Sequence, residues 1–366
     1  MGARARDVPE PAAIQSSDGE SRPVAYPPMQ PLIARERLSA LLDAGAGRRI
    51  AVIGDAMLDV YLRGDVERIS PEAPVPVVRV HERRRALGGA ANVAQNVAAL
   101  GAHAELVAVV GRDAAGETLR TMLEALGAEP RALVETGRPT TTKTRILARV
   151  QQVVRFDEEE DRDLDGAEVG IVLAAVERAV ADADALVLED YNKGVLVPAV
   201  IERAIALARA RKIPIVVDPK FRNFFSYGGA TVFKPNRREL EAALGAAVDL
   251  EHPEALPATL ARLAVDHLLL TLGERGMVLI GRDGTIARVP TTAREVYDVV
   301  GAGDTVTAYL AAMLAAGATA REASEASNFA AGVEVGKLGA ATVSSDEVLD
   351  AFDDFGARGG RVQGAP

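Results

Sequence analysis

Short apolar runs alternate with longer amphipathic segments along this 366-residue chain, and this alternation limits its possible folds more than any other feature. The apolar runs, each bounded by turn residues, are RRIAVIG, AELVAVVG, ALVLEDY, IPIVVDP, ATVFKPN and HLLLTLG. Such runs are typical of buried strands, and the segments between them have helical spacing. Strands joined through helices lie parallel and are covered on both sides. The sequence therefore predicts an α/β fold with a doubly wound, mainly parallel sheet and helices on both faces.

Two segments, at about 60–86 and 139–157, interrupt this alternation. They are rich in Val, Thr, Ile and Arg with partial two-residue alternation, which is typical of strands outside the main sheet. A small β lid over a cleft explains them, and so do surface hairpins without a role. At the ends, the proline-rich residues 1–31 are expected to be a disordered extension and residues 357–366 a flexible tail. The folded domain is expected to span 32–356.

The charge and composition exclude several classes of function. Lys and Arg number 42 against 52 Asp and Glu, and the resulting net charge of −10 argues against a nucleic-acid partner. The chain has no cysteine, which excludes disulfides, thiolate metal sites and a catalytic thiol. No apolar stretch approaches the roughly 18–20 residues that span a bilayer, and the N-terminus lacks a secretory apolar segment. A cytoplasmic protein without a membrane partner is expected.

The strongest chemical signal is the segment EVYDVVGAGDTVTAYLAAMLAAG at 295–317. Gly301, Ala302 and Gly303 form a small-residue loop that leads directly into a helix, whose first N–H groups attract anions. Asp304 in the same turn could accept a proton from an alcohol that attacks a phosphoryl group held there. A glycine turn followed by an Asp that only caps the helix explains these residues equally well. Both interpretations stay open on these residues alone.

Two further patterns suggest a ligand cleft. In LGGAANVAQNVAALG, Gly88 and Gly89 allow close backbone approach, and the amides of Asn92, Gln95 and Asn96 share one helix face. Such amides suit a polyhydroxylated ligand, although an exposed polar stripe has the same spacing. The second pattern is a set of carboxylates at strand ends, where open α/β sheets bind ligands. These residues are Asp55, Asp59, Asp190 and Asp218, and together they predict a hydroxyl- or metal-binding cleft.

In this order, the motifs resemble those of the ribokinase/PfkB family of sugar kinases, from about Ile50 to Thr342. The GGAAN and DVVGAGD segments match the two family signatures. FKPNRREL is similar to the family's N-x-x-E motif, and TLGERG is similar to its nucleotide-binding turn. The resemblance implies a carbohydrate kinase with ATP as co-substrate and Mg²⁺, and it leaves a monovalent-cation requirement open.

Within the family, the chain is most similar to the heptose 7-phosphate kinases, through RISPEAPVPVV, TKTRILARVQQVVRFD and EDYNKG. This implies phosphorylation of the anomeric hydroxyl of D-glycero-D-manno-heptose 7-phosphate to the 1,7-bisphosphate, in ADP-heptose and lipopolysaccharide core biosynthesis. A kinase-only form is expected, because no HxGH motif of a nucleotidylyltransferase is present. A PfkB kinase for another sugar or nucleoside is one alternative, and a non-catalytic sugar- or nucleotide-binding regulator is a second.

The resemblance also implies a role for individual residues. Asp304 would be the catalytic base, and Gly301, Ala302 and Gly303 the anion hole. The ATP side would comprise Asn236, Arg237, Arg238, Glu239, Thr271, Gly273 and Asn328, with Glu239 also an indirect ligand of Mg²⁺. The sugar would be held by Asp59, Gly88, Gly89 and Asn92, and its 7-phosphate by Arg145 and Lys193, which are favoured over Lys220 and Arg83 to Arg85. A homodimer formed through the lid strands is expected.

Overall fold

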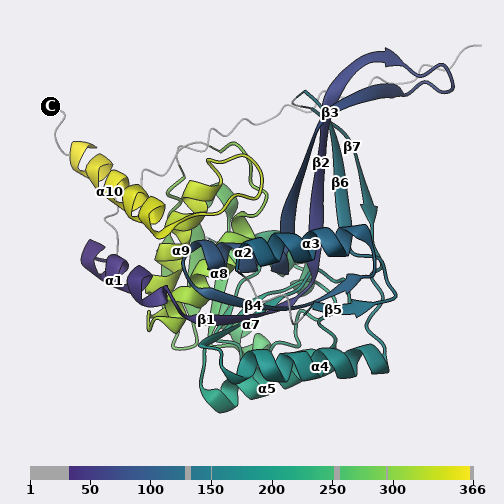
Figure 1. Cartoon of the computed structure of the whole chain (residues 1–366). Coiled ribbons are helices and arrows are strands. Elements are labelled where there is room, and N and C mark those ends of the chain that lie inside the picture. Colours follow the sequence, from purple (N-terminus) through teal and green to yellow (C-terminus); the bar gives the residue numbers. More distant parts are fainter. Residues whose placement is uncertain (1–32, 128–132, 150, 251–255, 294–295, 363–366) are drawn as a thin grey trace, which may run out of the picture.

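The computed structural model describes residues 33–127, 133–149, 151–250, 256–293 and 296–362. Within these ranges an α/β body carries a smaller sheet that rises from one side of it (Figure 1). The extension expected at 1–31 lies outside the described residues. None of the helices in the described ranges has the length and apolar character needed to cross a bilayer.

The main sheet has nine strands in the order β13-β12-β11-β10-β9-β8-β1-β4-β5. The strands from β5 to β11 pair in parallel, whereas β12 and β13 are antiparallel. The strands are β1 (Arg49–Gly54), β4 (His103–Gly111), β5 (Leu133–Thr136), β8 (Ala185–Glu189), β9 (Ile215–Asp218), β10 (Val232–Phe233), β11 (His267–Thr271), β12 (Met277–Gly281) and β13 (Ile286–Val289). This confirms the predicted mainly parallel sheet.

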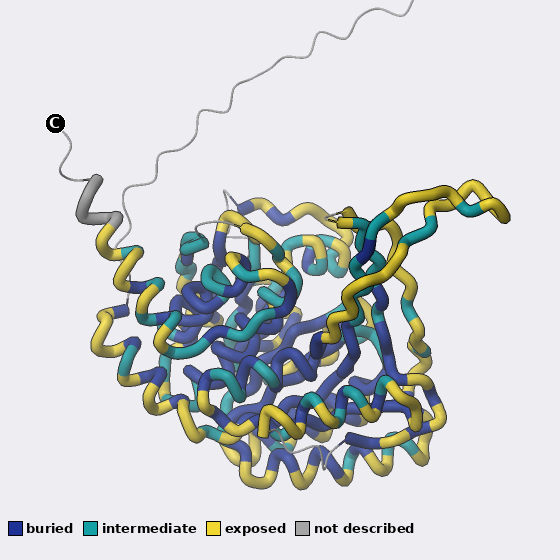
Figure 2. The backbone as a smooth tube through the Cα atoms, turned by 45° about the horizontal axis from the view of Figure 1, so that its top comes forward, coloured by how far each residue is buried: buried dark blue, intermediate teal, exposed yellow. Residues whose placement is uncertain are grey.

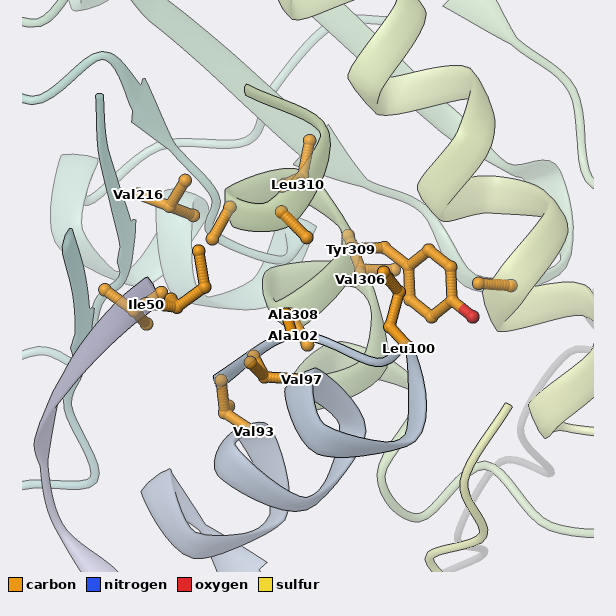
Figure 3. Packing of buried hydrophobic residues seen from close by; sticks show 14 of the residues in the cluster. Ile50, Val93, Val97, Leu100, Ala102, Val216, Val306, Ala308, Tyr309 and Leu310 are labelled. Carbon is orange, nitrogen blue, oxygen red and sulfur yellow. The ribbon is translucent and has the colours of Figure 1, made fainter. Parts of the chain in front are cut away.

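Helices cover both faces of this sheet because successive strand residues point to opposite sides. Ile50 of β1 packs into the core beneath α1, α2 and α8 to α10, whereas Ile53 packs beneath α4 to α7. Figure 3 shows Val93, Val97 and Tyr309 in the first of these cores. The helices are α1 (Arg35–Gly45), α2 (Ala90–Ala99), α3 (Ala114–Ala125), α4 (Gly166–Ala181), α5 (Pro198–Arg211), α6 (Arg237–Leu244), α7 (Leu256–Leu263), α8 (Ala302–Ala315), α9 (Ala320–Glu334) and α10 (Ser345–Val362), with a short η3 (Gly273–Arg275). Helix α10 continues to Val362, so the first residues expected as a tail at 357–366 are helical.

The two segments that interrupt the alternation form a separate sheet in the order β3-β2-β6-β7. Its strands are β2 (Ala56–Ile69), β3 (Pro76–Gly89), β6 (Thr142–Ala148) and β7 (Gln151–Glu158). The hairpin of β2 and β3 is longer than expected, because it begins directly after β1 and ends at the start of α2. Its base is buried and its far end is exposed (Figure 2). The hairpin therefore brings Asp59 and Gly88 from the small sheet to the carboxyl edge of the main sheet.

Candidate active site

A pocket of about 760 Å³ opens at the carboxyl ends of the central strands, beside the N-terminus of α8. The sequence predicted many of the residues that line it: Gly301, Ala302, Gly303, Asp304, Asn236, Glu239, Thr271, Gly273 and Asn328. It did not single out Tyr191 or Lys234, which also line the pocket. The position of Lys234, two residues before the N-x-x-E motif at the end of β10, is the signal that could have found it.

The loop before α8 has the geometry of an anion site. Gly301 is the N-cap residue with a positive φ of 99°, and no side chain of the described residues caps the helix. The first N–H groups of α8 therefore remain available at the positive end of its dipole. A Cβ on Gly301 would lie 3.0 Å from the Asn92 Nδ2 atom and 3.1 Å from the Glu334 Oε1 atom. The positive φ thus favours glycine here, and a Cβ would also require its neighbours to move by a few tenths of an ångström.

Asp304 lies at this helix end but does not cap it. Its Oδ2 accepts a hydrogen bond from Asn92 Nδ2 at 2.7 Å, and its Oδ1 accepts one from the Tyr191 hydroxyl at 2.9 Å. Burial raises the pKa of Asp304 to about 6, although these two hydrogen bonds favour its charged form. The structure therefore supports the general-base interpretation of Asp304 over the capping interpretation, because such a pKa suits proton transfer near neutral pH.

We expect kcat/KM to fall as the pH drops below about 6, because a protonated Asp304 cannot accept the proton of a substrate hydroxyl. Above that pH the carboxylate is ionised and the profile should be flat until another group titrates. Initial rates between pH 5 and 8 measure this. The acid limb should disappear in the residual activity of Asp304→Asn, and an unchanged limb in that variant would assign it to another group.

A cluster of charges lies beside the anion site. Lys234 Nζ is 2.8 Å from Asp218 Oδ2, and Lys220 Nζ is 2.5 Å from Glu239 Oε1. Oxygen atoms of Glu189, Asp218 and Asp304 lie within 4.8 Å of one another. Glu189 is fully buried, and burial raises its pKa well above the usual value, with the charge of Asp218 adding to this. Carboxylate oxygens are the ligands that Mg²⁺ prefers, so this donor set fits a divalent cation.

Asn236 and Glu239 of the N-x-x-E motif line the pocket, whereas the two arginines between them do not. Asn236 and Glu239 form a reciprocal capping box, in which each side chain accepts the other's backbone N–H at 2.9 and 2.8 Å. This leaves Glu239 Oε1 facing Lys220 in the pocket. Arg237 instead pairs with Glu241 at 2.7 Å, and neither Arg237 nor Arg238 is among the described residues that line the pocket. The structure does not bring these two arginines to the expected ATP side.

The small sheet contributes a second group of polar residues near the site. Asp59 is buried, and Arg145 Nη1 lies 2.5 Å from its Oδ1. A Cβ on Gly88 would lie 2.6 Å from Asp59 Oδ2, which explains the first glycine of the motif. Lys193, also expected near the sugar, places its Nζ 2.7 Å from Glu159 Oε1. Both basic residues are therefore held by carboxylates at the base of the small sheet.

Several polar residues of the predicted cleft have structural partners instead. The three N–H groups of Tyr191, Lys193 and Val195 donate to Asp55, and the Tyr227 hydroxyl donates to Asp190 at 2.8 Å. The prediction that all four strand-end carboxylates face a ligand is therefore wrong for Asp55 and Asp190. Strand-end position alone could not distinguish them from Asp59 and Asp218.

The three side-chain amides that share one face of α2 also have different partners. Asn92 contacts Asp304, but Asn96 is fully buried and accepts a hydrogen bond from Thr305 Oγ1 at 3.2 Å. Gln95 Nε2 contacts Asn92 Oδ1 at 3.4 Å. The shared helix face therefore packs against α8, and only Asn92 of these three amides reaches the base. The alternative of an exposed polar stripe is wrong as well.

Comparison with known proteins agrees with this site. Residues 48–347 match the model of the pfkB family of carbohydrate kinases. The bifunctional protein HldE of Gluconacetobacter diazotrophicus is 48% identical over 316 residues, covering 85% of this chain and 65% of that protein. HldE of Rhodospirillum rubrum is 43% identical over 339 residues, covering 90% of this chain and 67% of that protein. This chain thus spans about 65% of the length of the first of these curated relatives.

Solved structures share the fold at lower identity. Phosphofructokinase-2 from Escherichia coli in complex with potassium is 20% identical with a TM-score of 0.71, covering 84% of this chain and 99% of that one. Ribokinase from Arabidopsis thaliana complexed with ribose and ATP is 19% identical with a TM-score of 0.66, over the same 84% and 99%. The family match, the ribokinase-like fold and the site around Asp304 agree, and the chain belongs to the pfkB family of carbohydrate kinases.

Proposed function

We propose that this protein transfers the γ-phosphoryl group of ATP to the anomeric hydroxyl of D-glycero-D-manno-heptose 7-phosphate. The product would be the 1,7-bisphosphate, a step of ADP-heptose and lipopolysaccharide core biosynthesis in the cytoplasm. The observation that carries the proposal is the buried Asp304 carboxylate at the anion site, held there by Asn92 of the GGAAN motif. The heptose assignment is supported by the RISPEAPVPVV segment and by the 43–48% identity with HldE proteins.

The geometry suits in-line phosphoryl transfer. The N–H groups at Gly301, Ala302 and Gly303 would bind the oxygens of the transferring group, where negative charge gathers. Asp304 would orient the sugar hydroxyl and take its proton as the new oxygen–phosphorus bond forms. The bond from the γ-phosphorus to the bridging oxygen breaks, and ADP leaves with that electron pair. No other protein group needs to accept the proton.

Asp218 and Glu239, which line the pocket beside the anion site, would hold Mg²⁺. Glu189 would add a carboxylate oxygen next to Asp218. When bound, the ion supplies neutralisation of the phosphate charge. Both oxygens of Glu189 are buried and its carboxyl contacts that of Asp218, so a bound cation would compensate the charge of this buried pair. Lys220 and Lys234 flank this group and would bind phosphate oxygens of ATP.

A monovalent cation would bind at Glu334, on the other side of the anion site. Burial raises the pKa of this carboxyl to about 8, with Asp298 adding to it and the Ala341 N–H partly opposing it. Within the described ranges, neither carboxylate oxygen accepts a hydrogen bond of normal geometry. A cation here would compensate the charge of the Glu334 carboxylate. It would also stabilise the loop at Gly301, which lies close to Glu334, since a Cβ on Gly301 would be 3.1 Å from Glu334 Oε1. The solved phosphofructokinase-2 complex with potassium supports testing K⁺.

The 7-phosphate would bind on the inner face of the small sheet. Tyr61 pairs in register with Arg84 on one side and Arg145 on the other, two residues beyond Asp59 and thus about 7 Å farther along β2. The Tyr61 hydroxyl is buried without a hydrogen-bond partner in the described part of the chain, and the Arg145 guanidinium lies 5.2 Å from its ring centroid. Arg145 uses one donor on Asp59 and keeps others for phosphate. Lys193 would approach from the loop after β8.

We expect Arg145→Gln to raise the KM for heptose 7-phosphate by about tenfold or more, because charge-assisted hydrogen bonds to the phosphate are lost. Steady-state kinetics with heptose 7-phosphate and with the unphosphorylated heptose measure this, and only the first KM should rise strongly. Arg155→Gln is the matched control, because Arg155 is the register partner of Arg145 on β7 but is exposed. An equal rise with both sugars would show that Arg145 acts only through Asp59.

The substrate itself is tested by ATP consumption with Mg²⁺, with and without K⁺. Heptose 7-phosphate is compared with ribose, fructose, fructose 6-phosphate and adenosine. Turnover with the heptose phosphate alone supports the proposal. Turnover with another acceptor would keep the kinase and discard the heptose assignment.

We expect a homodimer formed through the small sheet. Ile69 is 60% exposed and Val75 is 51% exposed at the end of the β2–β3 hairpin, and Phe156 is 45% exposed on edge strand β7. Apolar side chains next to unpaired strand edges favour association. Light scattering over a range of concentrations should give twice the chain mass, and Ile69→Asp combined with Val75→Asp should shift it to a monomer. A monomer for the wild-type protein at all concentrations would exclude the dimer.

A further inference from the structure

The hydroxyl of Tyr191 contacts the base from the side opposite Asn92. It donates to Asp304 Oδ1 at 2.9 Å, while Asn92 Nδ2 donates to Asp304 Oδ2 at 2.7 Å. Each carboxylate oxygen is thus held by one donor, and the donors come from different elements. Tyr191 follows β8 in the EDYNKG segment, 113 residues before Asp304, and the sequence did not indicate that the two side chains meet.

The backbone of Tyr191 is held in place independently of Asp304. The buried Asp55 carboxylate accepts N–H bonds from Tyr191 at 2.8 Å, from Lys193 at 2.9 Å and from Val195 at 3.2 Å. The loop between these residues is tightly bent, with a positive φ of 86° at Gly194. Asp55 therefore binds three donors of one loop and fixes the position from which the Tyr191 side chain extends.

The ring of Tyr191 lies beside Gly89, and Lys220 Nζ lies 4.9 Å from the ring centroid. Because the backbone of Tyr191 is held by Asp55, the hydroxyl extends to Asp304 from a fixed loop position. Burial and the adjacent Asp304 raise the pKa of the phenol well above 10, so the hydroxyl remains a donor.

We propose that Tyr191 is a positioning residue, which together with Asn92 fixes the plane of the Asp304 carboxylate for proton transfer. A carboxylate at the start of a helix otherwise rotates about its last torsion with little resistance. Donors on both oxygens remove this freedom and leave the remaining lone pairs directed at the substrate hydroxyl. Asp55 anchors the loop that carries Tyr191, and it acts on the base only through that loop.

The experiment compares Tyr191→Phe with the wild-type enzyme. The ring and its packing remain, and only the donor to Asp304 is lost. We expect kcat to fall about 10- to 100-fold, the range for a hydrogen bond to a charged group, while the KM values for ATP and sugar stay within about twofold. The thermal midpoint should stay close to that of the control below.

Tyr309→Phe is the matched control. Tyr309 is fully buried, lies on the same helix as Asp304, and donates its hydroxyl to the Val343 carbonyl oxygen at 2.9 Å. The Tyr309→Phe variant therefore also loses one buried tyrosine hydroxyl, but this hydroxyl does not contact Asp304. Its kcat should stay within about twofold of wild type. A second readout is the double variant: in the Asp304→Asn background, Tyr191→Phe should have little further effect, because both changes act through one carboxylate.

A wild-type kcat in Tyr191→Phe would overturn the proposal, and so would an equal loss in Tyr309→Phe or a full additional loss in the double variant. A change confined to the sugar KM would make Tyr191 a substrate contact instead. The assay uses heptose 7-phosphate and thus rests on the proposed function. If the wild-type enzyme does not phosphorylate that sugar, the substrate assignment fails, and the same comparison is made with the acceptor that it does phosphorylate.

Discussion

Replacing Asp304 with asparagine is expected to lower kcat by about 10²- to 10⁴-fold, the range for loss of a general base. Asparagine has the same shape and keeps an oxygen acceptor, but its amide cannot take the proton of the sugar hydroxyl. The buried site would lose an ionisable group whose pKa burial raises to about 6, so the fold should be at least as stable as before. Steady-state kinetics and thermal unfolding measure the two effects.

The binding of ATP separates loss of chemistry from loss of structure. Its dissociation constant should change little in Asp304→Asn, because the residues proposed for ATP lie at Asn236, Thr271 and Asn328. Activity within tenfold of wild type would exclude Asp304 as the base. A large loss of ATP affinity with unchanged kcat would give it a binding role.

The second large effect is expected for Gly301→Ala, with kcat lower by about 10²- to 10³-fold, comparable to loss of an oxyanion-hole donor. The added Cβ would approach Asn92 Nδ2 at 3.0 Å and Glu334 Oε1 at 3.1 Å. Alanine is also strained at the observed φ of 99°. Relief of this strain and crowding would displace the N–H groups of the anion site or the Asn92 amide that holds Asp304.

Gly317→Ala is the matched control for this prediction. Gly317 follows the other end of α8 and has a similar φ of 87°, and a Cβ added there would meet no atom of the described residues within 4 Å. It should therefore show the strain of a positive φ as a lower thermal midpoint without a loss of kcat. Equal losses of kcat in both variants would attribute the effect of Gly301 to the stability of α8 alone.

The sequence by itself determined the architecture and indicated Asp304 as the candidate base. Buried strands and helices leave periodic signals of a few residues, so β1, β4, β8, β9 and β11 and the helices between them could be located without coordinates. Gly301 reports a local requirement, because its positive φ at the helix start favours glycine. The small sheet was also predictable, since it interrupts the helical spacing, although its strands proved longer.

Only the tertiary structure decided which polar side chains face the site. Asp55 and Asp59 are four residues apart and look alike in the sequence, yet Asp55 binds backbone N–H groups 136 to 140 residues away and Asp59 pairs with Arg145. Tyr191 lies in the EDYNKG segment, which gave no indication of a partner, and its contact with Asp304 exists because β8 ends beside the start of α8. Local periodicity reports the face on which a residue lies. The partner that a polar group finds there depends on segments far apart in the chain, which only the packed fold brings together.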